Sequence, residues 1–212
     1  MLQYVNAKKY KHLNNLINLW NGEYKKTFPI KKALYKKHIL EDVNFNKDAS
    51  FIALYDNEPV GFVLIKTWLQ DSGLVDESDT AYISLMFVKK EMRNMGIGSD
   101  LLKLALSEIK KHTTIKKLVV GNEINCLFAG IPNEISNSPI FFINKGFIQQ
   151  ENVVDMIRVL REDSFDEIEK GELNVSIATE EEKDELLKLC ITNKLSKEAY
   201  LPFQRSEGDN WW

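Results

Sequence analysis

The sequence predicts an α/β (α+β) fold, in which helices flank a mixed, mainly antiparallel sheet. Runs of β-forming residues at 50–55 and 60–67 are separated by four turn-forming residues at 56–59, which predicts an antiparallel hairpin. Further along the chain, a strand at 81–88, an amphipathic helix and a short strand at 117–120 make a β-α-β unit. Hairpins that precede a β-α-β unit indicate a sheet with both antiparallel and parallel pairs.

The chain ahead of the hairpin is predicted to form a strand at 2–5 and two helices. The first helix is indicated by apolar residues that recur at three- and four-residue spacing, namely Leu13, Leu16, Ile17 and Trp20. The second helix is expected over 30–41, with Thr27 as its candidate cap and Pro29 suited to a first turn.

The helix of the β-α-β unit begins near Gly96, because polar residues such as Asp100 and Lys103 stay outside one connected apolar face. That face consists of Ile97, Leu101, Leu104, Ala105 and Ile109.

A further helix follows the strand at 117–120. Pro139 is suited to open this helix, with Asn137 or Ser138 as the cap, and Gly146 ends it. Two final strands are expected in the segments that come next, 147–150 and 153–160.

The composition is that of an ordinary soluble globular protein, with 44% hydrophobic and 28% charged residues among 212. The chain has no run of about 18 or more apolar residues, and its start lacks the apolar segment of a secretory signal. We therefore expect a cytoplasmic protein without a membrane partner. A net charge of −3 gives no reason to expect nucleic acid. Cys126 and Cys190 are isolated and the three histidines lack partners at ligand spacing, so we expect reduced cysteines and no metal.

A shift in charge marks a domain boundary. Residues 161–185 carry eleven acidic side chains against three basic ones, whereas residues 1–160 are net positive. We therefore expect one domain over 1–160, an acidic linker over 161–172, and a partial second domain or docking tail over 173–212.

The order seen at the start of the chain, a strand followed by a helix, is repeated in this tail. The sequence predicts a strand at 173–177 and a helix at 179–189, in which Thr179 and Glu182 fit a capping box. Some 40 residues cannot bury a core unaided. The tail must dock on the first domain, dock on another copy to give a homodimer, or stay loosely ordered.

The most informative stretch is 88–99, which lies between a strand and an amphipathic helix. Gly96 and Gly98 let the backbone approach a ligand closely, and the helix start presents unpaired N–H groups and a positive dipole end. A diphosphate fits that arrangement. The alternative is a tight turn that only feeds a helix, and neither a GxGxxG nor a P-loop motif is present.

The run of a strand, Arg-x-x-Gly-x-Gly, and a helix with Leu101 and Leu102 resembles the acetyl-CoA signature of the GNAT superfamily of N-acetyltransferases. Further stretches are similar to family landmarks and occur in the family order: 19–21, 51–53 with 59–63, 141–147 and 154–156. More narrowly, Gly130-Ile131-Pro132 resembles the N-terminal half of bacterial proteins that contain two tandem GNAT domains.

This resemblance implies acetyl-CoA as co-substrate and a GNAT-type sheet that is splayed at the cofactor strand. It implies that backbone amides of the signature cradle the cofactor pyrophosphate; the residues are Arg93, Asn94, Met95, Gly96, Ile97, Gly98 and Ser99. It also implies that the pantetheine arm pairs with the strand through Met86, Phe87 and Val88.

The groups that transfer protons are less evident. Phe142 occupies the position where many GNAT enzymes carry a tyrosine that protonates the thiolate. Glu123, just beyond the strand at 117–120, is a weak candidate for the base, and a solvated loop glutamate is the favoured interpretation. The acidic stretch at 70–79 either attracts a cationic substrate or is simply a wet surface.

Three functional hypotheses follow. The leading one is an N-acetyltransferase that moves an acetyl group from acetyl-CoA to an amine of a small molecule or peptide. The second, motivated by Phe142, is a non-catalytic module that binds acyl-CoA. The third is the regulatory half of a tandem acetyltransferase. The sequence does not name the acceptor, because one fold hosts many specificities.

Overall fold

The computed structural model describes residues 1–67, 79–123, 125–132, 135, 138–150, 152 and 179–192. The chain divides into two compact units, Met1–Gln150 and Glu151–Trp212. The strands expected at 153–160 and 173–177, the acidic linker and most of the acidic loop lie outside the described residues.

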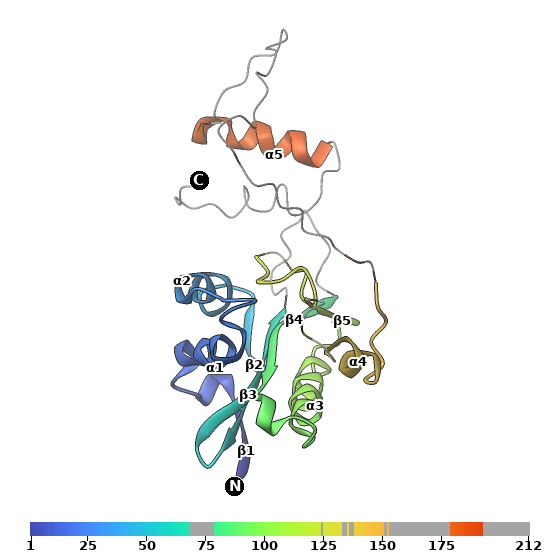
Figure 1. Cartoon of the computed structure of the whole chain (residues 1–212). Coiled ribbons are helices and arrows are strands. Elements are labelled where there is room, and N and C mark those ends of the chain that lie inside the picture. Colours follow the sequence, from blue (N-terminus) through green and yellow to red (C-terminus); the bar gives the residue numbers. More distant parts are fainter. Residues whose placement is uncertain are drawn as a thin grey trace. The chain divides into compact units, whose positions relative to one another are not determined.

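The first unit contains a five-stranded sheet with the order β1-β2-β3-β4-β5 (Figure 1). Its strands are β1 (Leu2–Asn6), β2 (Phe45–Tyr55), β3 (Glu58–Thr67), β4 (Thr80–Val88) and β5 (Lys117–Val120). The first four strands pair antiparallel, and β5 pairs parallel with β4. This arrangement confirms the predicted α/β (α+β) class.

The predicted hairpin is formed by β2 and β3. Its two turn residues, Asp56 and Asn57, have φ angles of 49° and 68°, a left-handed conformation that Asp and Asn tolerate. Strand β2 starts at Phe45, five residues before the predicted start, and a register shift between Asn46 and Phe51 interrupts its pairing with β3. Polar residues at 46–48 hide this first part of the strand from a search for β-formers.

Helices cover both faces of the sheet (Figure 1). On one face lie α1 (Leu16–Tyr24) and α2 (Lys32–Tyr35), the latter continued by a π-helical turn over Lys36–Leu40. On the other face lie α3 (Ile97–Ile109) and α4 (Ser138–Ile143). Two buried clusters result, one beneath α1 and α2 and one beneath α3 and α4.

Two details of the predicted helices and strands are wrong. Thr27 does not cap the second helix, because its amide donates to the Tyr24 carbonyl oxygen at 3.1 Å and so belongs to the end of α1. The segment 147–150 is not a strand. The Phe147 amide instead donates back to the Phe142 carbonyl oxygen at 3.1 Å, which closes the turn after α4, and Ile148 is 86% exposed.

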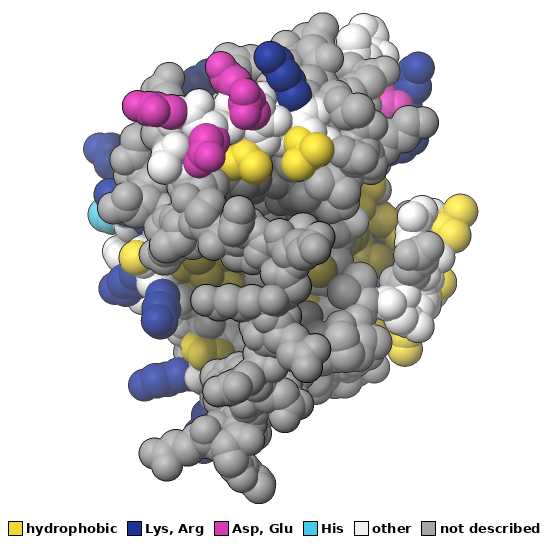
Figure 2. Space-filling view, turned by 90° about the horizontal axis from the view of Figure 1, so that it is seen from above, with side chains coloured by type: hydrophobic (Ala, Val, Ile, Leu, Met, Phe, Trp, Pro, Cys, Tyr) yellow, Lys and Arg dark blue, Asp and Glu magenta, His cyan; other side chains and the backbone are white. Residues whose placement is uncertain are grey.

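In the second unit the predicted helix is present as a short 3₁₀ turn (Glu180–Glu182) and α5 (Lys183–Thr192). The Thr179 amide donates to the Glu182 carboxylate at 2.7 Å, which confirms the Glu182 half of the predicted capping box. Carboxylates in the first turn also suit the positive end of the helix dipole. Figure 2, seen from above, shows several acidic side chains (magenta) near one another at one edge of the view. In the described ranges, no helix is both long and apolar enough to cross a bilayer.

Candidate active site

The site begins where β4 and β5 part. The two strands pair from Thr80 opposite Lys117 to Ile83 opposite Val120, and the Gly121 amide still reaches the Ile83 carbonyl oxygen at 3.0 Å. Strand β4 then continues to Val88 without β5 beside it. The backbone of 84–88 therefore has an edge that is open to an extended ligand.

A bulge in β4 lies at the start of this open edge. Leu64 of β3 is opposite Leu85, whereas the next residue, Ile65, is opposite Ile83, so Ser84 is an extra residue in the ladder. The Ser84 hydroxyl is buried and has no hydrogen-bond partner among the described residues. Ser84 is among the residues that line the pocket described below.

The predicted signature forms a loop that leads from β4 into α3. Asn94 and Gly96 have φ angles of 61° and 84°, and Gly96 is the residue before the helix. No side chain of the described residues caps α3. Its first backbone N–H groups are therefore available to an anion, and the helix dipole adds to their attraction.

The Arg93 side chain is engaged by the protein itself. Its Nε donates to the Val88 carbonyl oxygen at 2.9 Å. Its terminal nitrogen pairs with Glu23 at 2.5 Å and with the Tyr24 hydroxyl at 3.2 Å. Arg93 thus ties the signature loop to β4 and to the end of α1, and its guanidinium is committed to these contacts.

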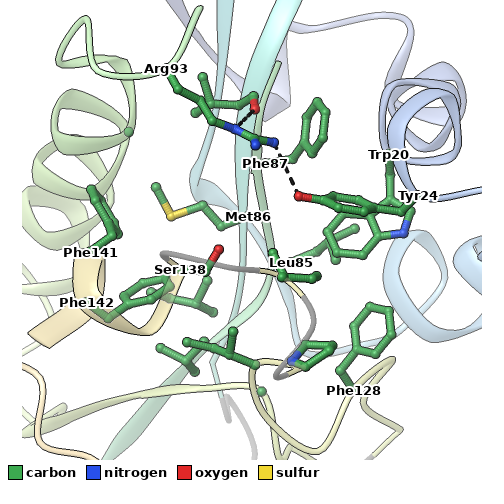
Figure 3. A pocket seen from close by; sticks show the side chains of 18 of the residues that line it. Trp20, Tyr24, Leu85, Met86, Phe87, Arg93, Phe128, Ser138, Phe141 and Phe142 are labelled. Atoms are coloured by element: carbon green, nitrogen blue, oxygen red, sulfur yellow. Dashed lines mark hydrogen bonds between the residues drawn. The ribbon is translucent and has the colours of Figure 1, made fainter. Parts of the chain in front are cut away.

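A pocket of about 500 Å³ joins the open edge of β4 to the signature loop. Figure 3 shows that two sets of side chains face each other across it. We call one set the signature half, comprising Met86, Val88, Arg93, Gly98, Phe141 and Phe142. We call the other set the aromatic half, comprising Trp20, Tyr24, Leu85, Phe87, Phe128 and Ile135. The Ser138 hydroxyl points into the space between them.

Most of the residues that the resemblance implies for the cofactor line this pocket. They are Met86, Phe87, Val88, Arg93, Asn94, Gly96, Gly98 and Ser99. Two do not line it: the Met95 side chain is 61% exposed, and Ile97 is buried in the cluster beneath α3. Phe142, at the position of the expected tyrosine, does line the pocket.

Glu123 is not the solvated loop glutamate that the sequence favoured. It is 3% exposed, and its carboxylate lies 3.5 Å from the ammonium of the fully buried Lys66. The same ammonium lies 3.1 Å from the Asp42 carboxylate and donates to the Asn125 carbonyl oxygen at 3.2 Å. Glu123 does not line the pocket. Its position therefore suits a role in holding the loop after β5 better than a role in proton transfer.

Asp79 and Cys126 are not among the residues that line the pocket. Asp79, the described end of the acidic loop, accepts from the Thr80 hydroxyl at 2.8 Å and pairs with Lys117 at 3.3 Å. Cys126 is a free thiol whose pKa is raised by burial. In the described part of the chain, no three metal-ligating side chains come together.

Several lining residues escaped the sequence reasoning. Trp20 and Tyr24 are four residues apart on α1, a spacing that places both on one helix face and signals a shared surface. Burial raises the pKa of the Tyr24 phenol above its ordinary value of 10.0. Phe128 and Ser138 come from irregular chain or a short helix, and no periodic pattern singles them out.

A second hollow of about 480 Å³ lies along α3, lined from Ser99 to Lys110. Ser99 lines both hollows. Three lysines line the second one, Lys103, Lys110 and Lys145, together with one acidic residue, Asp100. This hollow therefore offers positive charge directly next to the signature.

Comparisons with known proteins agree with this architecture. Residues 13–128, more than half of the chain, match the model of the acetyltransferase (GNAT) family. The chain is 26% identical over 117 residues to an uncharacterized N-acetyltransferase of Methanocaldococcus jannaschii. That match covers 55% of this chain and 46% of the relative, so the chain spans about half of the relative's length.

Two solved structures share the fold. One is the glucosamine N-acetyltransferase region of a fungal multi-domain β-N-acetylglucosaminidase, with a TM-score of 0.58 at 18% identity over 72% of this chain and 17% of that chain. The other is an aminoglycoside acetyltransferase from an uncultured soil metagenomic sample, in complex with trehalose. Its TM-score is 0.51 at 19% identity over 76% of this chain and 96% of that chain.

Proposed function

Because the chain belongs to the acetyltransferase (GNAT) family, we propose that it moves an acetyl group from acetyl-CoA to an amine of a small molecule or peptide. The observation that carries the proposal is the uncapped start of α3 at the mouth of a pocket that runs along the open edge of β4. The start of α3 suits a diphosphate, and the open edge of β4 suits an extended arm that contains amides.

Each part of coenzyme A finds a matching surface. The diphosphate takes the backbone amides between Arg93 and Ser99. The pantetheine amides pair with β4 at Met86, Phe87 and Val88, beyond the end of its pairing with β5, where the Val88 carbonyl oxygen also accepts from Arg93. The second hollow, with its three lysines next to Ser99, suits the additional phosphate on the ribose of coenzyme A.

Acetyl transfer requires the amine nitrogen to attack the thioester carbonyl carbon, after which the carbon–sulfur bond breaks. The amine loses a proton and the departing thiolate gains one. Phe142 cannot supply that proton. The hydroxyls of Tyr24 and Ser138 both line the pocket, and either can donate to a thiolate.

The cofactor site is tested by a side chain placed at Gly98. A Cβ added there meets the Phe141 ring at 3.4 Å and the Met86 methyl at 3.6 Å, inside the signature half. We expect the added side chain in Gly98→Val to take up space in the cofactor site and to weaken coenzyme A binding, measured by calorimetry, by about tenfold or more. A tenfold loss corresponds to contacts worth about 1.4 kcal/mol.

The matched control is Gly22→Val on α1, where an added Cβ meets nothing within 4 Å. It is expected to bind coenzyme A as the parent chain does. Equal binding by both variants and the parent would contradict the proposed site.

A second candidate function is an acyl-CoA-binding module without catalysis. Phe142, which has no proton to give, lines the pocket at the expected tyrosine position and favours this candidate. Incubation with acetyl-CoA, a panel of amines and a thiol-detecting dye separates the two, because a module binds the cofactor and releases no thiol. The tandem regulatory half, the homodimer and the cytoplasmic location remain predictions.

A further inference from the structure

The aromatic half of the pocket is a wall of packed rings. The Trp20 ring centre lies 4.7 Å from that of Tyr24 and 5.4 Å from that of Phe128. The Tyr24 and Phe87 rings meet edge to face, with centres 6.1 Å apart and planes at 86°. Figure 3 shows Trp20, Tyr24 and Phe128 on the same side of the pocket. Such a surface offers ring faces and edges to a flat apolar ligand.

Hydrogen bonds hold this wall in place without a ligand. The Trp20 indole N–H donates to the Phe28 carbonyl oxygen at 2.7 Å, so it needs no further partner. Arg93 fixes the Tyr24 hydroxyl at 3.2 Å. The Asn122 amide donates to the Phe128 carbonyl oxygen at 3.2 Å. Because these side chains are already ordered, ligand binding does not incur the entropy cost of ordering them.

The charge of the described lining also favours an apolar ligand. Among the described residues that line the pocket, Arg93 is the sole charged one, and Glu23 already balances it. A ligand with several ammonium groups would lose hydration there without a matching anion from these residues. A ligand with a single amine on an aromatic body has only one polar group, and that group is the one that reacts.

The two halves meet at β4. Met86 and Val88 belong to the cluster beneath α3, whereas Leu85 and Phe87 belong to the cluster beneath α1. A cofactor on the signature half therefore leaves the aromatic half for the second substrate. Resting on the proposed acetyl transfer, we propose that the acceptor is a primary amine carried on a flat aromatic body, bound against the wall that Trp20, Tyr24 and Phe128 form.

The experiment compares amines on the full chain with acetyl-CoA and a thiol-detecting dye. The panel is 2-phenylethylamine, propylamine, spermidine and sisomicin. We expect kcat/KM for 2-phenylethylamine to exceed that for each of the other three by about tenfold or more, since one favourable ring contact approaches that factor. Calorimetry of 2-phenylethylamine with the coenzyme A-loaded protein gives an independent binding readout.

The wall is tested by Phe128→Leu, which keeps apolar bulk and removes the ring. It is expected to weaken 2-phenylethylamine binding about three- to tenfold and to lower the ratio of kcat/KM for 2-phenylethylamine to kcat/KM for propylamine by a similar factor. The matched control is Phe28→Leu. Phe28 packs edge to face on Phe128 at 6.0 Å and lies outside the pocket lining. It should leave the preference intact.

The outcomes separate this inference from the proposed function. Faster turnover of spermidine or sisomicin than of 2-phenylethylamine overturns the inference and supports acetyl transfer. Binding of 2-phenylethylamine that weakens in Phe128→Leu, with no thiol release from any amine, overturns acetyl transfer and supports the aromatic site. If 2-phenylethylamine does not bind and no amine releases thiol, both the aromatic site and acetyl transfer are overturned.

Discussion

Lys66 has a buried side chain whose charge is shared between two carboxylates. Its ammonium lies 3.1 Å from Asp42 and 3.5 Å from Glu123, and all three side chains are almost fully buried. Neither Glu123 oxygen accepts a hydrogen bond within the described residues. The Lys66 ammonium therefore compensates the buried charge of Glu123. We infer that this ion pair stabilises the loop after β5.

Removal of this ammonium is predicted to be strongly destabilising. In Lys66→Met both carboxylates lose their cation, and breaking a buried ion pair from one side costs about 3–5 kcal/mol. The measurement is the free energy of unfolding in urea. Lys8→Met serves as the control, because its pair with Asp48 is exposed on both sides and is worth at most about 1 kcal/mol. A loss in Lys66→Met no larger than in the control would refute this account.

At the scale of an element, the loop between β5 and α4 carries one wall of the pocket. Gly121 starts it with a φ of 65°, and its Cα approaches the backbone of Phe128 and Gly130. An added Cβ would lie 2.7 Å from the Phe128 carbonyl oxygen. The loop thus turns back on itself at a position that only glycine fits, and this turn sets the place of the Phe128 ring.

Gly121→Ala is predicted to destabilise the protein and to reduce turnover of aromatic amines. Left-handed backbone costs about 1–2 kcal/mol for a residue with a side chain, and the overlap with backbone adds about 1–3 kcal/mol. Gly96→Ala separates the two effects in a thermal unfolding experiment. Its φ is 84°, yet an added Cβ meets nothing within 4 Å. Equal losses in the two variants would show that the close approach is unimportant.

At the scale of the whole first unit, the fold moves the ionisation of four tyrosines to higher pH. Burial is the largest cause that raises the pKa values of Tyr4, Tyr10, Tyr24 and Tyr35 above the ordinary value of 10.0. In the interval above that ordinary value, the unfolded chain loses protons that the folded chain keeps. The free energy of unfolding should therefore be steady below about pH 10 and fall as pH rises further.

Tyr35 is the most buried of the four, and its hydroxyl donates to the Leu13 carbonyl oxygen at 3.1 Å. Tyr35→Phe is expected to cost about 1 kcal/mol at pH 7, the net value of one hydrogen bond. Above pH 10 the variant should lose stability less steeply than the parent, because one of the four ionising groups is gone. Urea titrations at pH 7 and at pH 11 give both numbers, and parallel declines would contradict the assignment.

The sequence by itself determined the order of strands and helices from β1 to α4 and the glycine-marked turn that opens α3. Apolar periodicity locates α1 and α3, turn residues locate the β2–β3 hairpin, and Gly96 and Gly98 mark the start of α3. These features are local, since a few consecutive residues fix their own backbone conformation. The same local reasoning failed for 147–150, where the turn that closes α4 competes with strand formation.

Only the tertiary structure decided what surrounds the pocket. Glu123 is buried because Lys66, which lies on a different strand, reaches it, and no sequence spacing relates the two residues. Likewise, Tyr24 and Phe128 face one cavity because the pairing of five strands brings α1 and the loop after β5 together at the edge of β4. Contacts between residues far apart in the chain depend on the packed sheet as a whole, and a local pattern does not contain them.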